Sequence, residues 1–371
     1  MSSLPKKPKT LMVMAGGTGG HIFPALAVAD ELKARGWRVV WLGNPEGMEA
    51  RIVPQQGYEM AWVKFAALRG KGLLRKLLLP LNLFKAFAQA GKAIKTFKPD
   101  VVLGMGGYIT FPGGAMAKLH GIPLVIHEQN AVAGLANQAL GRIANLCLSG
   151  FPNVLPNAQW VGNPVRAEIA ALPTPEIRMA SQTAQIAANA SGQNPKRLRL
   201  LVVGGSLGAQ ALNEIVPKGI ALLPEDVRPE IVHQAGEKQI QILKSNYEKV
   251  GVEARCEAFI SDMAAAYAWA DVVICRAGAL TVAELAAAGV ASVLVPFPFA
   301  VDDHQTVNAQ FLAKQDAAIC LAQPLLTAAA VAELLQKPAQ EWQAMASKAR
   351  ACGKPLATQA VADLIEQEIS A

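Results

Sequence analysis

The chain has 371 residues, of which 52% are hydrophobic and 17% are charged, and its formal net charge is +7. This length predicts two domains, and the high apolar content suits α/β domains whose parallel strands are buried on both faces. The longest uncharged runs, 101–117 and 285–301, contain glycines or prolines and fall short of the about 20 apolar residues of a membrane-spanning helix. Only five apolar residues, 11–15, follow the N-terminal lysines, too few for a signal peptide, so a cytoplasmic chain is predicted.

Charge is distributed unevenly along the chain. Residues 1–166 contain 19 Lys and Arg against 7 Asp and Glu, whereas residues 167–371 contain 16 against 21. The N-terminal half therefore favours an anionic partner or surface. The five cysteines form no C-x-x-C pair, which is typical of free thiols in a reducing compartment, and the five histidines show no metal-binding spacing.

The first predicted unit is a buried strand at 11–15, a glycine loop at 16–21 and a helix at 24–35. Glycines let the backbone approach a ligand closely, and the N–H groups at a helix start favour phosphate. A phosphate-binding loop is one interpretation, and a glycine turn that only packs helix on strand is the other. The next strand, 37–42, ends at Gly-Asn (43–44), where a dinucleotide site would carry Asp or Glu for the ribose. This absence argues against an NAD-dependent oxidoreductase.

A basic segment lies between Glu59 and Asp100, where nine Lys or Arg residues alternate with leucines and phenylalanines and no acidic residue occurs. Such a segment can lie in the interface of an anionic membrane, where each cation contributes about 1 kcal/mol. The alternative is a crossover helix whose leucines face the core, with its periodicity interrupted at Pro80. The sequence leaves both interpretations open.

Two further strands are predicted to end in polar or glycine-rich loops. Strand 101–103 leads into Gly-Met-Gly-Gly-Tyr at 104–108, and strand 123–126 leads into His-Glu-Gln-Asn at 127–130. Because parallel strands of such a sheet end at one edge, these loops and the first glycine loop are expected to meet there. Convergence of this kind predicts a binding site.

The pattern restarts in the second half of the chain. After a strand at 145–149, the segment 151–166 is rich in Pro, Gly and Asn, which predicts a domain boundary near residue 166. A strand at 198–203 then precedes a second glycine loop at 204–209 and a helix. Ser206 in this loop either donates its hydroxyl to phosphate or caps the helix.

The remaining strands of the second half surround a βαβ unit. Strands are predicted at 230–234 and 258–260, the first again without an acid at its tip, and Ser-Asp-Met at 261–263 caps a helix. Residues 271–309 then give a strand, a glycine turn, a helix start with Thr281 and Glu284, a second strand and a polar loop. Such a unit collects polar groups at the carboxyl edge of a parallel sheet, where ligands bind.

Seven sequence blocks in order resemble those of the MurG family of bacterial N-acetylglucosaminyltransferases, in glycosyltransferase family 28. The resemblance extends from residue 11 to about residue 365. The blocks are GGTGGHIFPALAVA (16–29), GMGGY (104–108), HEQN (127–130), GNPVR (162–166), GGSLGA (204–209), AYAWADVVICRAGALTVAE (266–284) and DHQTVNA (303–309).

The resemblance implies a GT-B fold, an α/β architecture of two Rossmann-like domains with parallel sheets facing a central cleft. Residues 1–165 would form the domain for the acceptor, lipid I, and for the membrane, and residues 166–350 the domain that binds UDP-GlcNAc. Residues 351–371 would form a C-terminal helix that packs back on the N-terminal domain. The activity implied is an inverting transfer of GlcNAc to lipid I, which makes lipid II for peptidoglycan.

The resemblance also assigns roles to donor-site residues. Ser206 and Arg166 would hold the UDP diphosphate, Ile260 the uracil edge, Glu284 the ribose hydroxyls and Gln305 the GlcNAc hydroxyls. For Glu284 the alternative is a capping box with Thr281, in which the carboxylate turns back to its own helix. The full set of predicted donor- and substrate-binding residues is Thr18, Gly19, Gly20, Asn130, Arg166, Ser206, Ile260, Met263, Ala279, Leu280, Thr281, Val282, Ala283, Glu284 and Gln305.

An inverting displacement needs a base for the acceptor hydroxyl and stabilisation of the leaving diphosphate. His21, at the end of the first glycine loop, is the first candidate for the base, because a histidine side chain titrates near neutral pH. The alternative is a His21 that positions the loop or substrate without moving a proton. Glu128 is the second candidate, as base or as a group that orients the acceptor. No D-x-D motif occurs in a suitable loop, so neither a metal nor a cofactor is predicted.

The expected partners are UDP-GlcNAc, lipid I (undecaprenyl-pyrophosphoryl-MurNAc-pentapeptide), an anionic membrane surface and proteins of cell-wall synthesis or division, with no nucleic acid. The expected location is the cytoplasmic face of the inner membrane, as a peripheral protein. Two rival functions share parts of the pattern. A UDP-GlcNAc epimerase has the same two-domain layout, and a non-catalytic scaffold would use the membrane surface alone.

Overall fold

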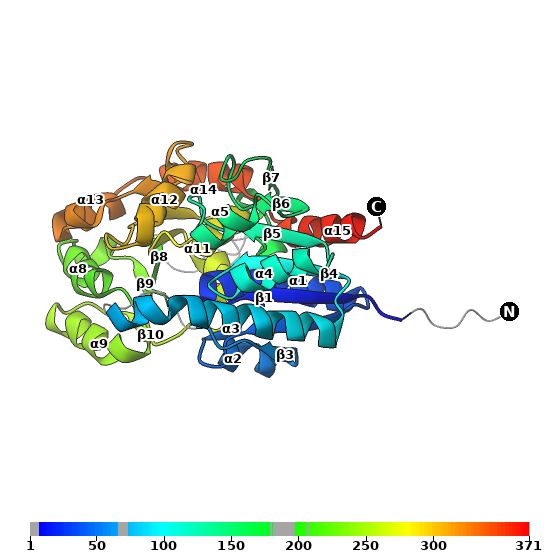
Figure 1. Cartoon of the computed structure of the whole chain (residues 1–371). Helices are drawn as coiled ribbons and strands as arrows, with labels where there is room; N and C mark the ends of the chain where they lie inside the picture. The colour runs from blue at the N-terminus through cyan, green and yellow to red at the C-terminus, as the bar shows by residue number, and fades with distance from the viewer. Residues whose placement is uncertain (1–6, 66–72, 179, 181–196, 206–207, 371) are drawn as a thin grey trace. The chain divides into compact units, whose positions relative to one another are not determined.

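The computed structural model describes residues 7–65, 73–178, 180, 197–205 and 208–370. By their contacts these residues divide into two compact units (Figure 1). Unit 1 is Met1–Arg166 together with Leu356–Ala371, and unit 2 is Ala167–Pro355. Each unit has its own parallel sheet with helices on both faces.

The described part of unit 1 contains a seven-stranded parallel sheet in the order β3-β2-β1-β4-β5-β6-β7. Its strands are β1 (Thr10–Ala15), β2 (Arg38–Gly43), β3 (Glu59–Trp62), β4 (Val101–Gly106), β5 (Leu124–Glu128), β6 (Leu146–Ser149) and β7 (Gln159–Trp160). Its helices are α1 (Gly19–Ala34), α2 (Glu49–Ile52), α3 (Leu73–Phe97), α4 (Thr110–Leu119), α5 (Leu135–Leu140), α15 (Ala357–Glu368) and a 3-10 turn at Pro54–Gln56.

Alternation along the central strand explains why this sheet is covered on both sides. In β1, Leu11 and Val13 face the core that contains α1 and α15, whereas Met12 and Met14 face the core that contains α3 and α4. Every residue of β1 is buried. A central parallel strand of this kind reads as an unbroken apolar run, which is how the sequence predicted it.

Several elements of unit 1 extend beyond their predicted bounds. Helix α1 begins at Gly19, five residues before the predicted start, so the last residues of the glycine loop form its first turn. Strand β4 continues through Gly106, and β5 includes the first half of the His-Glu-Gln-Asn block, 127–130. Strand β7 lies within the predicted linker. It was not predicted, because two exposed residues at a sheet edge give no apolar pattern.

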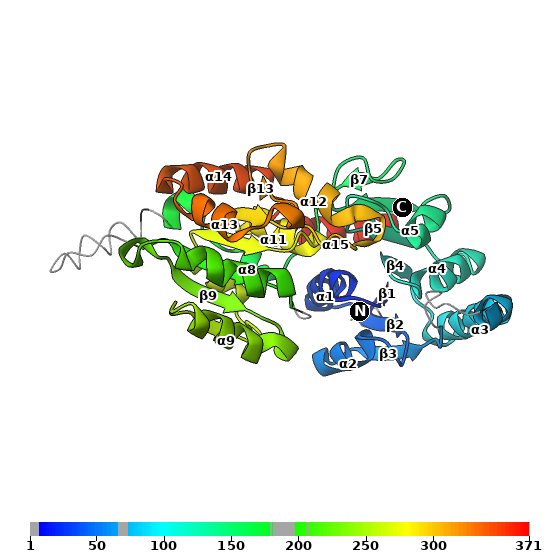
Figure 2. The ribbon, with the colours of Figure 1, turned by 90° about the vertical axis from the view of Figure 1, so that its left-hand side faces the viewer.

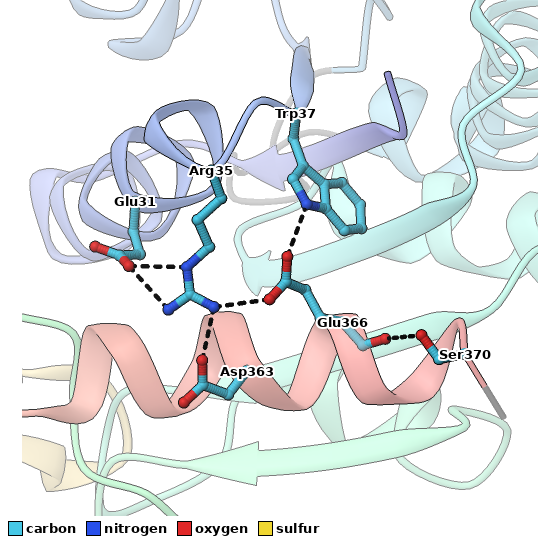
Figure 3. Close-up of polar contacts among 6 residues, drawn as sticks. All are labelled: Glu31, Arg35, Trp37, Asp363, Glu366 and Ser370. Carbon is cyan, nitrogen blue, oxygen red and sulfur yellow. Dashed lines mark hydrogen bonds and ion pairs between the residues drawn. The ribbon is translucent and has the colours of Figure 1, made fainter. Parts of the chain in front are cut away.

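The C-terminal helix α15 packs on α1 in unit 1. Val361, Ala362 and Ile365 are buried in the same core as α1. Figure 3 shows the polar contacts beside this core, where the Arg35 guanidinium bonds to Asp363 at 2.6 Å and to Glu366 at 2.8 Å. The Trp37 indole N–H donates to Glu366 as well, at 3.0 Å. The chain therefore returns to unit 1 after completing unit 2.

The described part of unit 2 contains a six-stranded parallel sheet in the order β10-β9-β8-β11-β12-β13. Its strands are β8 (Arg199–Val203), β9 (Glu230–Gln234), β10 (Arg255–Glu257), β11 (Val272–Cys275), β12 (Ala291–Leu294) and β13 (Ile319–Cys320). Its helices are α6 (Ala167–Ala170), α8 (Gln210–Ala221), α9 (Ile240–Lys249), α10 (Met263–Trp269), α11 (Ala279–Ala288), α12 (His304–Ala313), α13 (Ala328–Leu335) and α14 (Ala339–Cys352). Short 3-10 helices lie at Glu225–Val227, Glu237–Gln239, Val301–Asp303 and Gln323–Leu325.

This strand order is that of a doubly wound Rossmann sheet, in which the order reverses between β8 and β11. Helix α8 lies beside α13 (Figure 2), and both pack on the core that contains Leu200 and Val202 of β8. Two predicted bounds in this unit were wrong. The strand expected at 258–260 lies at Arg255–Glu257, and the boundary expected at residue 350 falls inside α14.

Candidate functional site

The loops after β1, β4 and β5 meet at the carboxyl edge of the unit 1 sheet. The Gly16 N–H donates to the Gly106 carbonyl at 3.4 Å, and the Gln129 amide lies 3.8 Å from the Met105 sulfur. Gly107, with a φ of 91°, lies so close to Gly16 that an added Cβ would be 2.4 Å from the Gly16 carbonyl oxygen. Only glycine fits at this contact, which holds the first two loops together.

His21 lies in the first turn of α1, partly buried between these two loops. Its Nδ1 is 3.2 Å from the Gly16 carbonyl oxygen and 3.3 Å from the Thr18 hydroxyl. Since a carbonyl only accepts, Nδ1 carries the proton in the neutral ring, and Nε2 carries the lone pair. The other edge of the ring lies against Gly106, where an added Cβ would be 3.0 Å from Nε2. This tautomer is the one that a general base requires.

Glu49, which the sequence interpretation missed, holds the first glycine loop by hydrogen bonds. Its carboxylate is 2% exposed and accepts from the Gly17 N–H at 3.1 Å and from the Asn44 N–H at 3.0 Å. Gly16, Gly43 and Gly47 close around it, because an added Cβ at any of them would approach within 3.0 Å of the Glu49 side chain. The Gly17 N–H therefore points to Glu49, and the loop can offer phosphate only the N–H groups that follow, at the start of α1.

Glu128 is buried at the end of β5 with both of its oxygens bonded. One oxygen accepts from the Asn130 N–H at 2.9 Å, and the other accepts from the Gly134 N–H at 3.1 Å and the Asn137 side chain at 2.9 Å. These bonds bend the chain that follows β5 around the carboxylate. The geometry is that of a group that shapes a loop, with Asn130 partly exposed on it.

His127 connects the same loop to the Gly-Asn-Pro-Val-Arg block. Its Nε2 donates to the Gly162 carbonyl at 2.9 Å, and its Nδ1 accepts from the Gln129 amide at 3.1 Å. Asn163 in turn donates to the Gln129 carbonyl at 2.9 Å. Complete burial lowers the pKa of His127 to about 4, so the ring is neutral and structural. Arg166, at the end of the block, is half-buried.

In unit 2 the second glycine loop follows β8 at the switch point of the sheet. Ser206 lies outside the described residues. The glycines around it are tightly placed: the Gly204 N–H donates to the Gln234 carbonyl, and an added Cβ at Gly208 would be 2.3 Å from the Ala235 carbonyl oxygen. The loop thus packs closely on the end of β9.

The start of α11 presents the predicted donor residues at the same edge. Ala279 and Val282 are buried, whereas Leu280, Thr281 and Ala283 are partly exposed. The N-cap of this helix is Gly278, so Thr281 and Glu284 lie too far along the helix to form the alternative capping box.

The Glu284 carboxylate is buried, with 4% exposure, and accepts from the Tyr267 hydroxyl at 3.2 Å. Tyr267 on α10 is itself buried, with 1% exposure, so its hydroxyl holds the Glu284 carboxylate in a fixed orientation. A carboxylate held this way at a sheet's carboxyl edge suits recognition of a diol.

Arg276, between β11 and α11, is a second residue that the sequence interpretation missed. Its guanidinium donates to the Val295 and Pro296 carbonyls and, at 2.7 Å, to the Gln323 side chain, and it lies over the Phe297 ring. Burial lowers its pKa. Because these acceptors are neutral, they do not neutralise the positive charge of Arg276. A diphosphate bound next to the donor residues would neutralise it.

The other predicted donor residues surround this edge less closely. The Gln305 side-chain oxygen accepts from the Phe297 N–H at 3.0 Å, which directs its amide nitrogen away from that contact. Asp262 caps α10 by accepting from the Ala265 N–H at 2.8 Å, as predicted. Met263, the first residue of this helix, is buried. Ile260 lines a cavity of about 1040 Å³ beside β10, and the residues of α11 do not line it.

Residues 73–97 of the basic segment form α3, which continues through Pro80. Ala86, Ala90 and Ile94 of this helix pack in the core, whereas Leu81 and Phe84 are exposed at 51% and 71%. Leu119, at the end of the neighbouring α4, is 76% exposed. Both predicted properties thus occur in one helix: a packed half and an exposed apolar surface among lysines. Across the described ranges, no helix has the length and apolar character needed to cross a bilayer.

Metal binding has no evident donor set in the described part of the chain. No group of three or more His, Cys, Asp or Glu side chains is placed to hold an ion there. The described residues of the site instead offer backbone N–H groups, hydroxyls, amides and arginine.

Two doubly wound parallel sheets, each with a glycine loop after its first strand, are the architecture of the GT-B glycosyltransferases. A crystal structure of Acinetobacter baumannii MurG has this fold, with a TM-score of 0.83 and 43% identity, covering 97% of this chain and 100% of that one. The glycosyltransferase of kitacinnamycin shares the fold at a TM-score of 0.66 and 19% identity.

Sequence comparison identifies the family of glycosyltransferases to which the chain belongs. Residues 11–148 match the glycosyltransferase family 28 N-terminal domain, and residues 199–367 match the glycosyltransferase family 28 C-terminal domain. The chain belongs to glycosyltransferase family 28.

Two bacterial relatives carry the same name, UDP-N-acetylglucosamine–N-acetylmuramyl-(pentapeptide) pyrophosphoryl-undecaprenol N-acetylglucosamine transferase. The protein of Dechloromonas aromatica (strain RCB) is 62% identical over 97% of this chain and 99% of its own length. The protein of Aromatoleum aromaticum is 60% identical, over 97% and 98%.

Proposed function

We propose that this enzyme transfers N-acetylglucosamine from UDP-GlcNAc to the C4 hydroxyl of MurNAc in lipid I, giving lipid II for peptidoglycan synthesis. The observation that carries the proposal is the identity of 60% and more, over nearly the full length, to enzymes named for this reaction. The donor edge of unit 2 and the glycine loops of unit 1 are consistent with a sugar-nucleotide donor and a diphosphate-bearing acceptor.

Unit 2 is proposed to bind the donor. Glu284, oriented by Tyr267, accepts from the ribose hydroxyls, and Ile260 offers backbone groups to the uracil. The first-turn N–H groups of α11 (279–281) and the Arg276 guanidinium stabilise the diphosphate as it leaves. Ser206 and Arg166 are proposed as further diphosphate ligands, on the resemblance alone.

Unit 1 is proposed to bind the acceptor and to supply the base. In one in-line step the acceptor O4 attacks the anomeric carbon, the bond from that carbon to the diphosphate oxygen breaks, and the electron pair leaves with UDP. His21 Nε2 takes the proton from O4, since its Nδ1–H is held by the Gly16 carbonyl. Glu128 already accepts bonds on both oxygens, so we assign it to shaping the loop with Asn130.

The acceptor carries a long lipid, so the enzyme is proposed to work at the cytoplasmic face of the inner membrane as a peripheral protein. Leu81, Phe84 and Leu119 supply exposed apolar contacts, and the exposed Lys85 and Lys92 of α3 supply attraction to anionic lipid. Proteins of cell-wall synthesis or division remain proposed partners that would use this location.

The test is mass spectrometry of the product formed from UDP-GlcNAc and a lipid I analogue. The expected product is the acceptor with one added N-acetylhexosamine, and its absence with folded enzyme would reject the function. His21→Ala is expected to lower kcat by at least about 100-fold, the usual contribution of general base catalysis. His120→Ala serves as the matched control, since His120 lies at the end of α4 with its ring bonded to the Met116 carbonyl.

The same experiment separates the rival functions. An epimerase would convert UDP-GlcNAc without acceptor, whereas the transferase consumes donor only when acceptor is present. A non-catalytic scaffold would form no product under either condition.

A further inference from the structure

A cavity of about 170 Å³ opens at the amino edge of the unit 2 sheet. Its wall includes Leu198, Asp271 and Val290, which immediately precede the first residues of β8, β11 and β12. The donor residues of α11 lie at the carboxyl edge of the same strands. Because the two edges are opposite ends of a parallel sheet, the cavity is separate from the donor site.

Positive charge predominates in the wall of this cavity. Arg178, Arg197 and Lys337 line it, and among the described lining residues Asp271 is the only acid. The Asp271 carboxylate is already bound by the Arg199 guanidinium, at 2.8 Å and 3.2 Å, and by the Arg199 N–H at 3.0 Å. Lys337 has a partner of its own, Glu341, at 2.6 Å on the surface. The cavity therefore contains more cations than its own carboxylate neutralises.

Two buried donors at this place have no hydrogen-bond partner. Trp342, which lines the cavity, is 2% exposed, and its indole N–H donates to nothing. A guanidinium nitrogen of Arg350 is also buried and unpartnered. Arg350 adjoins the cavity, since an added Cβ on the lining residue Gly289 would be 2.9 Å from the Arg350 Cβ. Buried donors without acceptors are unfavourable, so an acceptor from outside would stabilise this arrangement.

Arg178 connects the cavity to the donor helix. Its guanidinium donates to the carbonyls of Ala288, the last residue of α11, and Gly289, the C-cap, at 2.7 Å and 2.6 Å, and also to the Pro173 carbonyl. All of these partners are neutral. Burial lowers the pKa of Arg178 and the nearby charge of Arg350 lowers it further, while the Glu176 carboxylate partly offsets both effects. An anion in the cavity would relieve the repulsion among these arginines.

We propose that this cavity is a binding site for a phosphoryl group, either inorganic phosphate or the phosphate of a small phosphomonoester. Its volume admits one such group and excludes a nucleotide sugar, which needs a pocket of several hundred Å³. Trp342 and the cationic residues Arg178, Arg197 and Lys337 line it from separate elements, which suits a tetrahedral anion with several acceptor oxygens.

The test follows the Trp342 indole by NMR in the full chain labelled with ¹⁵N in the tryptophan side chains. UDP is present at saturation, so that phosphate does not report on the donor site. Inorganic phosphate and, in a second arm, phenyl phosphate are titrated against sodium chloride of equal ionic strength. One of the six indole N–H signals is expected to shift saturably, and Trp342→Phe is expected to remove that signal.

The charge requirement is tested with Lys337→Gln combined with Arg197→Gln, which is expected to weaken phosphate binding at least about tenfold because two charge-assisted contacts are lost. Lys348→Gln is the matched control, since Lys348 is an exposed lysine of α14, the helix that carries Trp342, and is paired with Asp316 outside the cavity. Saturation by phosphate alone or by phenyl phosphate alone supports the site and identifies its source. An indole signal that does not move, that moves equally with chloride, or that saturates unchanged in the double variant overturns the proposal.

Discussion

Replacing Glu49 by glutamine tests whether the first glycine loop of unit 1 is held from within. The buried carboxylate accepts from two backbone N–H groups, those of Gly17 and Asn44. Glutamine has the same shape but only one acceptor oxygen, so its NH₂ group must face one of these N–H donors. An unsatisfied buried donor costs about 1–3 kcal/mol, and the remaining bond loses the assistance of a charge, so a loss of about 2–4 kcal/mol in the free energy of unfolding is expected.

The same substitution is expected to lower kcat, because the Gly16 carbonyl that orients His21 adjoins the displaced Gly17. The KM for UDP-GlcNAc should change little, since the proposed donor residues belong to unit 2. Urea unfolding at pH 7.5 and steady-state kinetics measure the two effects. Glu59→Gln is the matched control, because Glu59 is a half-exposed glutamate of the same unit, paired with Arg38 on the surface.

Two results would refute this reasoning. An unchanged urea midpoint would show that the buried carboxylate is not needed by its two donors. A lowered midpoint with an unchanged kcat would show that the loop holds its geometry without Glu49, and that His21 is oriented by other contacts.

Three further predictions concern buried or paired groups. Burial lowers the pKa of His127 to about 4 and that of His233 to about 3, below the 6.5 of the unfolded chain, so their contribution to stability is complete above pH 6.5 and is lost as the pH falls toward those values. The free energy of unfolding, measured by urea unfolding from pH 7.5 to pH 4.5, should decrease by up to about 3 kcal/mol per histidine, and His233→Phe should flatten this pH dependence. Arg35→Ala should weaken the attachment of α15 by about 1–2 kcal/mol, because it leaves Glu31, Asp363 and Glu366 without their common cation. Limited proteolysis near residue 355 should therefore become faster. The control variant Ser370→Ala should show no change in the rate of proteolysis. Tyr267→Phe should raise the KM for UDP-GlcNAc about 3- to 10-fold, since one neutral hydrogen bond orients Glu284, and an unchanged KM would contradict the assigned role of that hydroxyl.

Much of the fold was predictable because its signals are local. Strand β1 and strand β11 are uninterrupted apolar runs, and each is followed by a glycine turn and a helix within a few residues. Strand β9 has the predicted bounds, and Asp262 caps α10 as predicted. Elements without an apolar pattern were missed, as with the two-residue edge strand β7.

The candidate site was predictable only in part. The sequence indicated His21, Glu128 and Glu284 as polar residues at strand ends or helix starts. The positions of His21 and Glu128 are confirmed, whereas Glu284 lies in the second turn of α11 and not in the first. It did not indicate Glu49, which belongs to no motif, and it assigned no role to Arg276, although Arg276 lies in the block at 266–284. Glu49 is one acid in a turn, and its partner Gly17 lies 32 residues away. Its role depends on the packing of three glycines around it.

What the sequence by itself determined is the central strands of each sheet, the glycine loops and the family, since each depends on residues that are neighbours along the chain. Only the tertiary structure decided how the charged side chains are used. It gave Glu49 and Glu128 to backbone N–H groups, oriented Glu284 toward Tyr267, and turned the Nδ1 of His21 to a carbonyl. The physical reason is that a buried polar group must find its partner in space, and the partner that packing brings within 3 Å is not encoded by spacing along the chain.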